Sequence, residues 1–115
     1  MAYAVGVYWV MRFVETPVFT RAICEFVPDE VYRALQIALL LRPEQGSLIP
    51  GGGGLRKVRC QSAGRGKRGG LRVIYFWHPE EAVFYMLLAY PKSHQQNLSP
   101  EQSRILRRVV KEDLK

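Results

Sequence analysis

The sequence predicts an α+β fold in which a small, mostly antiparallel sheet packs against helices. Two pairs, Thr16-Pro17 and Ser99-Pro100, have the residue types that begin helices: a capping hydroxyl followed by proline at the first helical position. Between them, three strand-like stretches follow residue 54, separated by short segments rich in glycine or containing proline. Strands this close along the chain favour antiparallel pairing, and we expect the helices to cover one face of the sheet.

The first half of the chain is predicted to form one strand and two helices. Residues 12–16 (RFVET) form the strand, and Pro17 begins a helix with Val18, Ala22 and Phe26 on its apolar face. Asp29-Glu30 begin the second helix, which ends before Pro43. Its stripe consists of Val31, Leu35, Ala38, Leu39 and Arg42.

The second half is predicted to form three strands and a helix, at 55–60, 71–77, 82–90 and from Pro100 onward. The last helix has an apolar stripe made of Ile105, Leu106, Val109 and Val110. In the first of the strands, Lys57 and Arg59 face one side and Arg56 the other. The complete order is therefore strand, helix, helix, strand, strand, strand, helix.

Length and composition limit the class of protein. At 115 residues the chain forms one domain, residues 1–115, and we interpret residues 1–11 as a candidate N-terminal extension. The net charge of +7 points to a polyanionic partner. Cys24 and Cys60 lack metal-site spacing, and we expect both to be buried thiols in a reducing cytoplasm. The N-terminal apolar stretch is too short for a membrane span, so no membrane partner is predicted.

Seven cations gather around the predicted strands. If consecutive strands pair as hairpins, they converge on one side of the sheet; they are Lys57, Arg59, Arg65, Lys67, Arg68, Arg72 and Lys92. Several cations on one side suit a polyphosphate backbone that is held at several points. Tyr75, Tyr85 and Tyr90 are candidate stacking faces for unpaired bases, although aromatic residues in such apolar strands are usually core.

Three motifs, GLRKVR, GRGKRGGLRVIYFW and LLAYPK, resemble in order and spacing the HigB branch of the RelE/HigB toxins of bacterial type II toxin–antitoxin modules. The resemblance extends from about Phe13 to the last helix. It implies a microbial-ribonuclease-like fold, cleavage of mRNA in the ribosomal A site, and a cognate HigA-like antitoxin as partner. It also implies catalytic roles for Lys57, Arg59, Arg72 and Lys92. The tyrosine that RelE-like members often carry shortly after the last of these positions is missing here, where the sequence reads SHQQNLSPE.

Metal-independent RNA cleavage needs a base, an acid and cations that stabilise the phosphorane. Lys57, crowded by other cations, and His94 are the candidates for acid and base. Arg56, Arg65, Lys67 and Arg68 are predicted to bind ribosomal RNA rather than to do chemistry. No metal-ligand cluster is apparent, and no cofactor is predicted. Two alternatives remain at this point: a non-catalytic RNA- or ribosome-binding module, and a toxin-like fold retained only for its antitoxin contact.

Overall fold

The computed structural model describes residues 11–60 and 70–114. Its sheet contains five strands in the order β1-β5-β4-β3-β2. Their bounds are Arg12–Glu15 (β1), Ser47–Leu48 (β2), Arg56–Cys60 (β3), Leu71–His78 (β4) and Val83–Pro91 (β5). Only β1 runs parallel to its neighbour, and every other pairing is antiparallel. The predicted α+β class with a mostly antiparallel sheet is confirmed.

The helices begin where the capping residues predict. Thr16 accepts a hydrogen bond from the Phe19 N–H at the start of α1 (Pro17–Phe26). Ser99 and Gln102 form a reciprocal capping box at the start of α3 (Pro100–Val109), which continues into a π-helical turn, η2 (Val110–Leu114). The remaining helix, α2 (Asp29–Leu41), has two acidic residues in its first turn, where they complement the helix dipole.

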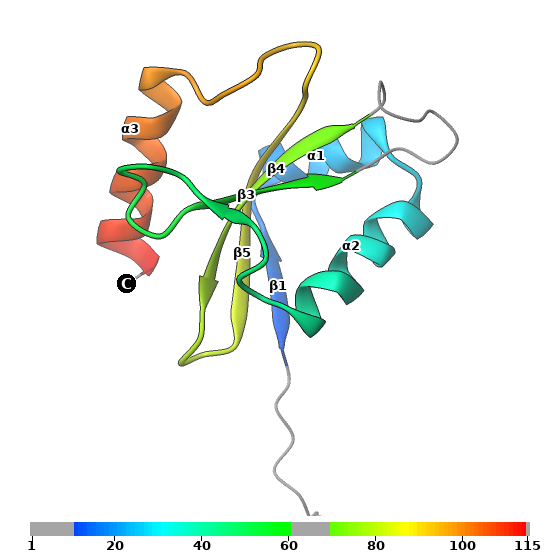
Figure 1. Ribbon diagram of the computed structural model, residues 1–115, viewed down its shortest axis with the longest axis horizontal. Coiled ribbons are helices and arrows are strands. Elements are labelled where there is room, and N and C mark those ends of the chain that lie inside the picture. Colours follow the sequence, from blue (N-terminus) through cyan, green and yellow to red (C-terminus); the bar gives the residue numbers. More distant parts are fainter. Residues whose placement is uncertain (1–10, 61–69, 115) are drawn as a thin grey trace, which may run out of the picture.

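Helices cover both faces of the sheet, so the expectation of a single covered face is wrong (Figure 1). On one face, α1 and α2 pack on a core that includes Val73, Tyr75, Phe84 and Met86. On the other face, which we call the α3 face, Leu106 and Val110 pack against Leu55, Ile74, Phe76, Leu87 and Tyr90. The period-two alternation of β4 supplies both cores.

Two helix faces and one thiol differ from the sequence-based prediction. In α1 the buried residues are Phe19 and Ile23, whereas Val18 is 52% exposed and Phe26 36% exposed. In α3, Ile105 lies outside the core and is 50% exposed. Cys24 is exposed, and only Cys60 is buried. In each case the buried face of the helix is rotated about the helix axis relative to the predicted face. The residues that select the buried face come from distant parts of the chain, so local spacing does not reveal it.

The edge strand β2 was not predicted. Its two residues pair with Lys57 and Arg56 of β3. A β-bulge between β4 and β5 shifts the register between Ile74 and Tyr75, so that Leu87 and Leu88 both contribute to the α3 face.

Candidate active site

The central strands place two arginines and a tyrosine in one row across the sheet. In the strand register Arg59 lies opposite Arg72, and Arg72 lies opposite Tyr90. Directly opposite residues point to the same face, with Cβ atoms about 4.5–5.5 Å apart. Lys57, two residues before Arg59, shares this face and lies opposite Ile74, which belongs to the α3-face core. We call Lys57, Arg59 and Arg72 the cationic corner.

The backbone beneath Arg72 is firmly held. Its neighbours Leu71 and Val73 are buried in the opposite core, and Arg72 itself is half-buried. Arg59 is exposed, and its aliphatic stem runs beside Gly70, where an added methyl group would lie 3.8 Å from Cγ. The corner therefore combines one guanidinium on a rigid base with one at the rim.

Lys57 is positioned by a residue that the sequence did not single out. Its Nζ donates to Oδ1 of Asn97 at 3.2 Å, and Asn97 lies in the segment between β5 and α3. The amide of Gln95 donates to the Asn97 carbonyl and to Oε1 of Gln102, both at 2.9 Å. Because Gln102 belongs to the capping box, these polar contacts connect Lys57 to the beginning of α3.

Tyr90, predicted from the sequence only as a candidate stacking face, lies opposite Arg72 in the strand register. Its hydroxyl is buried and has no hydrogen-bond partner within the described ranges 11–60 and 70–114. Burial raises the pKa of Tyr90 above its usual value, while the nearby Arg72 acts in the opposite direction. A stacking role remains a prediction for Tyr85, which is half-buried. The Tyr90 ring is buried in the α3-face core and is not available to stack on a base. Tyr75 is fully buried as well, with its hydroxyl bonded to Pro43 and Gly46.

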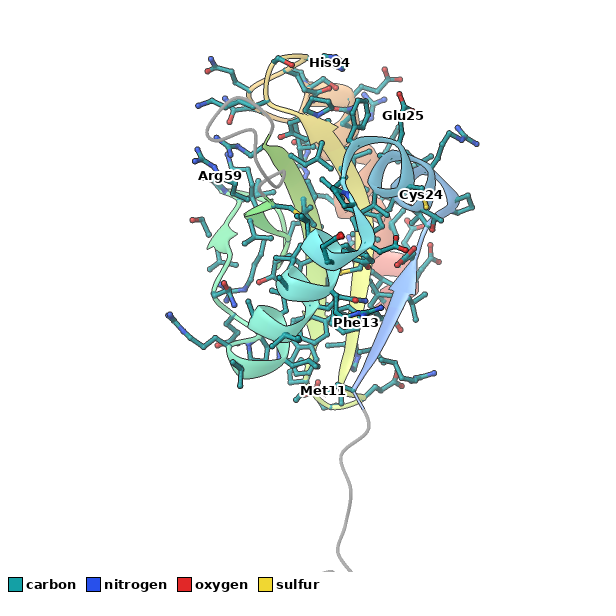
Figure 2. The ribbon with its side chains drawn as sticks, turned by 90° about the vertical axis from the view of Figure 1, so that its right-hand side faces the viewer. Met11, Phe13, Cys24, Glu25, Arg59 and His94 are labelled. Atoms are coloured by element: carbon teal, nitrogen blue, oxygen red, sulfur yellow. The ribbon has the colours of Figure 1, made fainter. Side chains whose placement is uncertain are left out.

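The segment after β5 carries the other two predicted catalytic residues. The Lys92 N–H donates to the Gly70 carbonyl at 3.3 Å, which places Lys92 next to the beginning of β4. The His94 ring packs edge-on against Phe26 of α1, with ring centroids 6.0 Å apart. Arg59 and His94 lie at the same end of the molecule, opposite Met11 (Figure 2).

Among the cations predicted to bind RNA, only Arg56 falls within the described residues. It points away from the cationic corner, and its Nη1 donates to the carbonyls of Glu44 at 2.8 Å and Gly46 at 2.7 Å. The guanidinium thus secures the connection from α2 to β2. Arg65, Lys67 and Arg68 lie outside the described residues.

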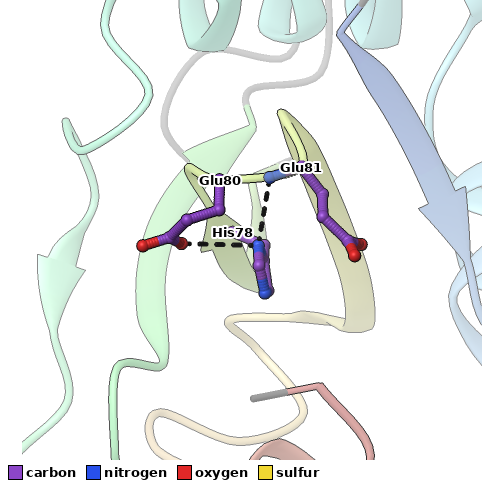
Figure 3. A network of polar contacts seen from close by, with 3 residues as sticks. All are labelled: His78, Glu80 and Glu81. Carbon is purple, nitrogen blue, oxygen red and sulfur yellow. Dashed lines mark hydrogen bonds and ion pairs between the residues drawn. The ribbon is translucent and has the colours of Figure 1, made fainter.

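The second histidine belongs to a turn at the other end of the sheet. His78 is the last residue of β4, whereas Arg72 is near the beginning of that strand. Its Nδ1 accepts from the Glu81 N–H at 3.3 Å and lies 3.7 Å from Oε1 of Glu80 (Figure 3). These contacts stabilise the turn between β4 and β5, at the opposite end of β4 from Arg72.

The residues at the corner suit phosphate chemistry. Guanidinium groups present forked donors that match phosphate oxygens in pairs, and two of them lie side by side here. In the described part of the chain, no group of three or more His, Cys, Asp or Glu residues is arranged to hold a metal ion. Over the same residues, no helix has the length and apolar character needed to cross a membrane.

A comparison with known protein families agrees with this geometry. Residues 37–115 match the family described as the RelE toxin of the RelE / RelB toxin-antitoxin system. The match covers more than half of the chain, from α2 to the C-terminus, and contains every residue of the cationic corner. The chain belongs to the RelE toxin family, so it is a toxin of a toxin–antitoxin system. Toxins of this family are generally ribonucleases that inhibit translation, and they pair with an antitoxin.

Proposed function

We propose that this chain is a HigB-type, metal-independent endoribonuclease that cleaves mRNA in the ribosomal A site, in the cytoplasm, and is silenced by a HigA-like antitoxin. The row formed by Arg59 and Arg72, with Lys57 beside it on the same face, is the observation that carries this proposal. A binding surface needs cations along a track, whereas cleavage needs them around one phosphate. The strand register, which brings Lys57, Arg59 and Arg72 to one face at neighbouring positions, supports the second arrangement.

The proposed chemistry assigns one role to each group. The neutral amine form of Lys57, held by Asn97, accepts the proton of the 2′-hydroxyl and becomes the ammonium, and the 2′ oxygen then forms a bond to phosphorus. Arg72 and Arg59 stabilise the negative charge of the phosphorane, and Lys92 adds a further contact after β5. The bond to the 5′ oxygen breaks, and His94 supplies the proton that this leaving group needs. Arg65, Lys67 and Arg68 bind ribosomal RNA phosphates.

Arg72→Ala tests the proposal because Arg72 has the most rigid base of the corner. Removing one preorganised donor from a transition state typically slows a reaction about 10²–10³-fold. We expect single-turnover cleavage on programmed ribosomes to slow at least about 100-fold while ribosome binding persists. Mapping of mRNA ends after expression should show cuts in frame within translated regions for the wild-type chain and far fewer for the variant.

The matched control is Arg33→Ala, which removes the same charge from an exposed position on α2. It should cleave at the wild-type rate. If Arg72→Ala also cleaved at the wild-type rate once bound, Arg72 would not belong to the active site. Ribosome binding by a wild-type chain that cleaves nothing would favour the non-catalytic binding module instead.

A further inference from the structure

A groove separate from the cationic corner lies between α3 and the glycine turn that precedes β3. Its volume is about 460 Å³, and its lining consists of Gly51, Gly53, Arg104, Arg107, Arg108, Val110, Lys111 and Glu112. The turn lies beside the C-terminal part of α3, away from the β3–β4 end where Arg59 lies (Figure 1). From Leu55 to Arg59 the chain rises about 14 Å along the strand.

The cations of this groove outnumber its acids, because four cationic side chains share the lining with one carboxylate, that of Glu112. Each of its four cations has another cation three or four residues away on one helical stretch, a spacing at which like charges repel. Arg104 has an exposed partner in Glu101 at 3.9 Å, and Arg107 reaches the Gly51 carbonyl at 3.5 Å. Within the described residues, the side chains of Arg108 and Lys111 make no hydrogen bond or ion pair.

Helix polarity explains only some of these cations. Basic residues in the last turn of α3 interact favourably with the negative end of the helix dipole, which accounts for Arg107 and Arg108. Arg104 lies in the first half of the helix, where the dipole gives it no such benefit. The cluster is therefore larger than helix stability requires.

The opposite wall of the groove is bare backbone. Gly51 and Gly53 have φ angles of +69° and +70°, and a Cβ on either residue would have no atom within 4 Å. A ligand can approach this turn without meeting side chains. The groove thus has a cationic wall of long side chains and a low wall of glycine, which suits an extended anionic chain better than a compact anion.

We infer that the groove between α3 and the Gly51–Gly54 turn is a second RNA-binding site, which holds phosphodiester groups of a strand outside the catalytic corner. Because α3 packs on the face to which Lys57, Arg59 and Arg72 point, one RNA molecule can reach both sites without crossing the sheet. The inference rests on the proposed function only in naming RNA as the polyanion. The strand is either mRNA or ribosomal RNA, which share the same backbone chemistry.

The test uses the double variant Arg108→Gln/Lys111→Gln, whose positions are exposed and make no contact that the fold needs. Its matched control is Arg21→Gln/Arg33→Gln, which removes the same charge from exposed positions on α1 and α2. The measurement is the salt dependence of binding to a single-stranded RNA with 2′-O-methyl groups, which cannot be cleaved. Ribosomes without mRNA form a second arm.

Each lost phosphate contact should reduce the slope of log affinity against log salt by about 0.7 for a single strand. Two lost contacts mean that the wild-type chain loses about sevenfold more affinity than the groove variant between 50 and 200 mM salt. The control should match the wild type. A reduced slope with the RNA oligonucleotide identifies mRNA as the strand. A reduced slope with ribosomes alone identifies ribosomal RNA.

If the groove variant and the control had equal slopes of log affinity against log salt, the inference would be overturned. The salt dependence would then not depend on the groove cations in particular. Binding to polyglutamate is measured in parallel. If the groove variant lost affinity for polyglutamate but not for RNA, the inference would be overturned in favour of an acidic protein segment as the ligand. Every arm measures binding and none measures cleavage. Failure of the cleavage proposal would therefore leave this test unaffected.

Discussion

Cys60 shows how a single buried group imposes a pH dependence on the whole chain. Burial raises the pKa of its thiol to about 11 from an ordinary value of 9.0. Between these values the unfolded chain releases the proton while the folded chain keeps it. The folded state then binds more protons, so the free energy of unfolding falls as pH rises through this window and is unaffected by this group below it.

We expect Cys60→Ala to have a flatter dependence of unfolding free energy on pH between about 9 and 11 than the wild type has. The measurement is denaturant unfolding at a series of pH values, compared by slope because the substitution also removes packing. Cys24→Ala, at an exposed thiol, is the matched control and should keep the wild-type slope. Parallel curves for wild type and Cys60→Ala would contradict this account. Tyr32, Tyr75 and Tyr90 also have raised pKa values and contribute to the slope above their ordinary value of 10.0. Because burial and, to a smaller extent, Cys60 itself raise the pKa of Tyr32, the slopes are compared below that value, where only the thiol contributes.

The candidate site was predictable where it depends on strand periodicity and unpredictable where it depends on register. Alternation alone places Lys57 and Arg59 on one face, as the sequence indicates. The juxtaposition of Tyr90 with Arg72 requires the pairing of β4 with β5, which includes a bulge between these two strands. Asn97 reaches Lys57 from 40 positions away, and no local pattern marks such a contact.

At the scale of elements, Tyr75 holds the connection between α2 and β2 in place. The Tyr75 hydroxyl accepts a hydrogen bond from the Gly46 N–H at 3.0 Å and donates one to the Pro43 carbonyl at 2.8 Å. Tyr75→Phe would leave the buried Gly46 N–H and the half-buried Pro43 carbonyl without this partner, at a cost of about 1–3 kcal/mol. Guanidinium unfolding should show this loss.

Tyr90→Phe is the matched control, because the Tyr90 hydroxyl has no partner in the described part of the chain. We expect its unfolding free energy to change by less than about 0.5 kcal/mol. Equal losses for the two substitutions would mean that the loop contacts of Tyr75 contribute nothing to stability.

The sequence predicted where the helices begin more accurately than it predicted which helix faces are buried. Thr16-Pro17 and Ser99-Pro100 begin helices in the structure as predicted, because capping is a local interaction between neighbouring residues. The two-residue strand β2 has no local signal, since it is a strand only through its pairing with β3. The buried faces of α1 and α3 are likewise selected by the sheet beneath them.

At the scale of the whole molecule, the two cores share one sheet. Successive residues of β4 enter opposite cores: Val73 and Tyr75 on one side, Ile74 and Phe76 on the other. Neither core can unfold without disturbing β4, which also forms part of the other core. We therefore expect the domain to unfold in a single transition.

Leu55→Ala tests this coupling, because Leu55 is fully buried and belongs to the α3-face core alone. The substitution should cost about 2–5 kcal/mol. Far-UV and near-UV circular dichroism should still follow one common curve. Leu41→Ala, at a residue that is 78% exposed, is the control and should change stability little. Separate transitions in the two signals would show that the cores unfold independently.

The shortness of β2 also affects how the chain behaves in a crowded solution. In the described chain, β2 pairs only with Lys57 and Arg56, so β3 continues beyond it through Val58 to Cys60 as the edge of the sheet. Unpaired strand edges invite strands from other molecules, and a charged residue on the edge discourages such self-association. Arg59 is that charge, so the cation that we propose for phosphate chemistry also keeps the sheet edge charged. An apolar replacement at Arg59 would consequently promote aggregation as well as remove a cation, whereas Arg59→Gln keeps the edge polar and isolates the loss of charge.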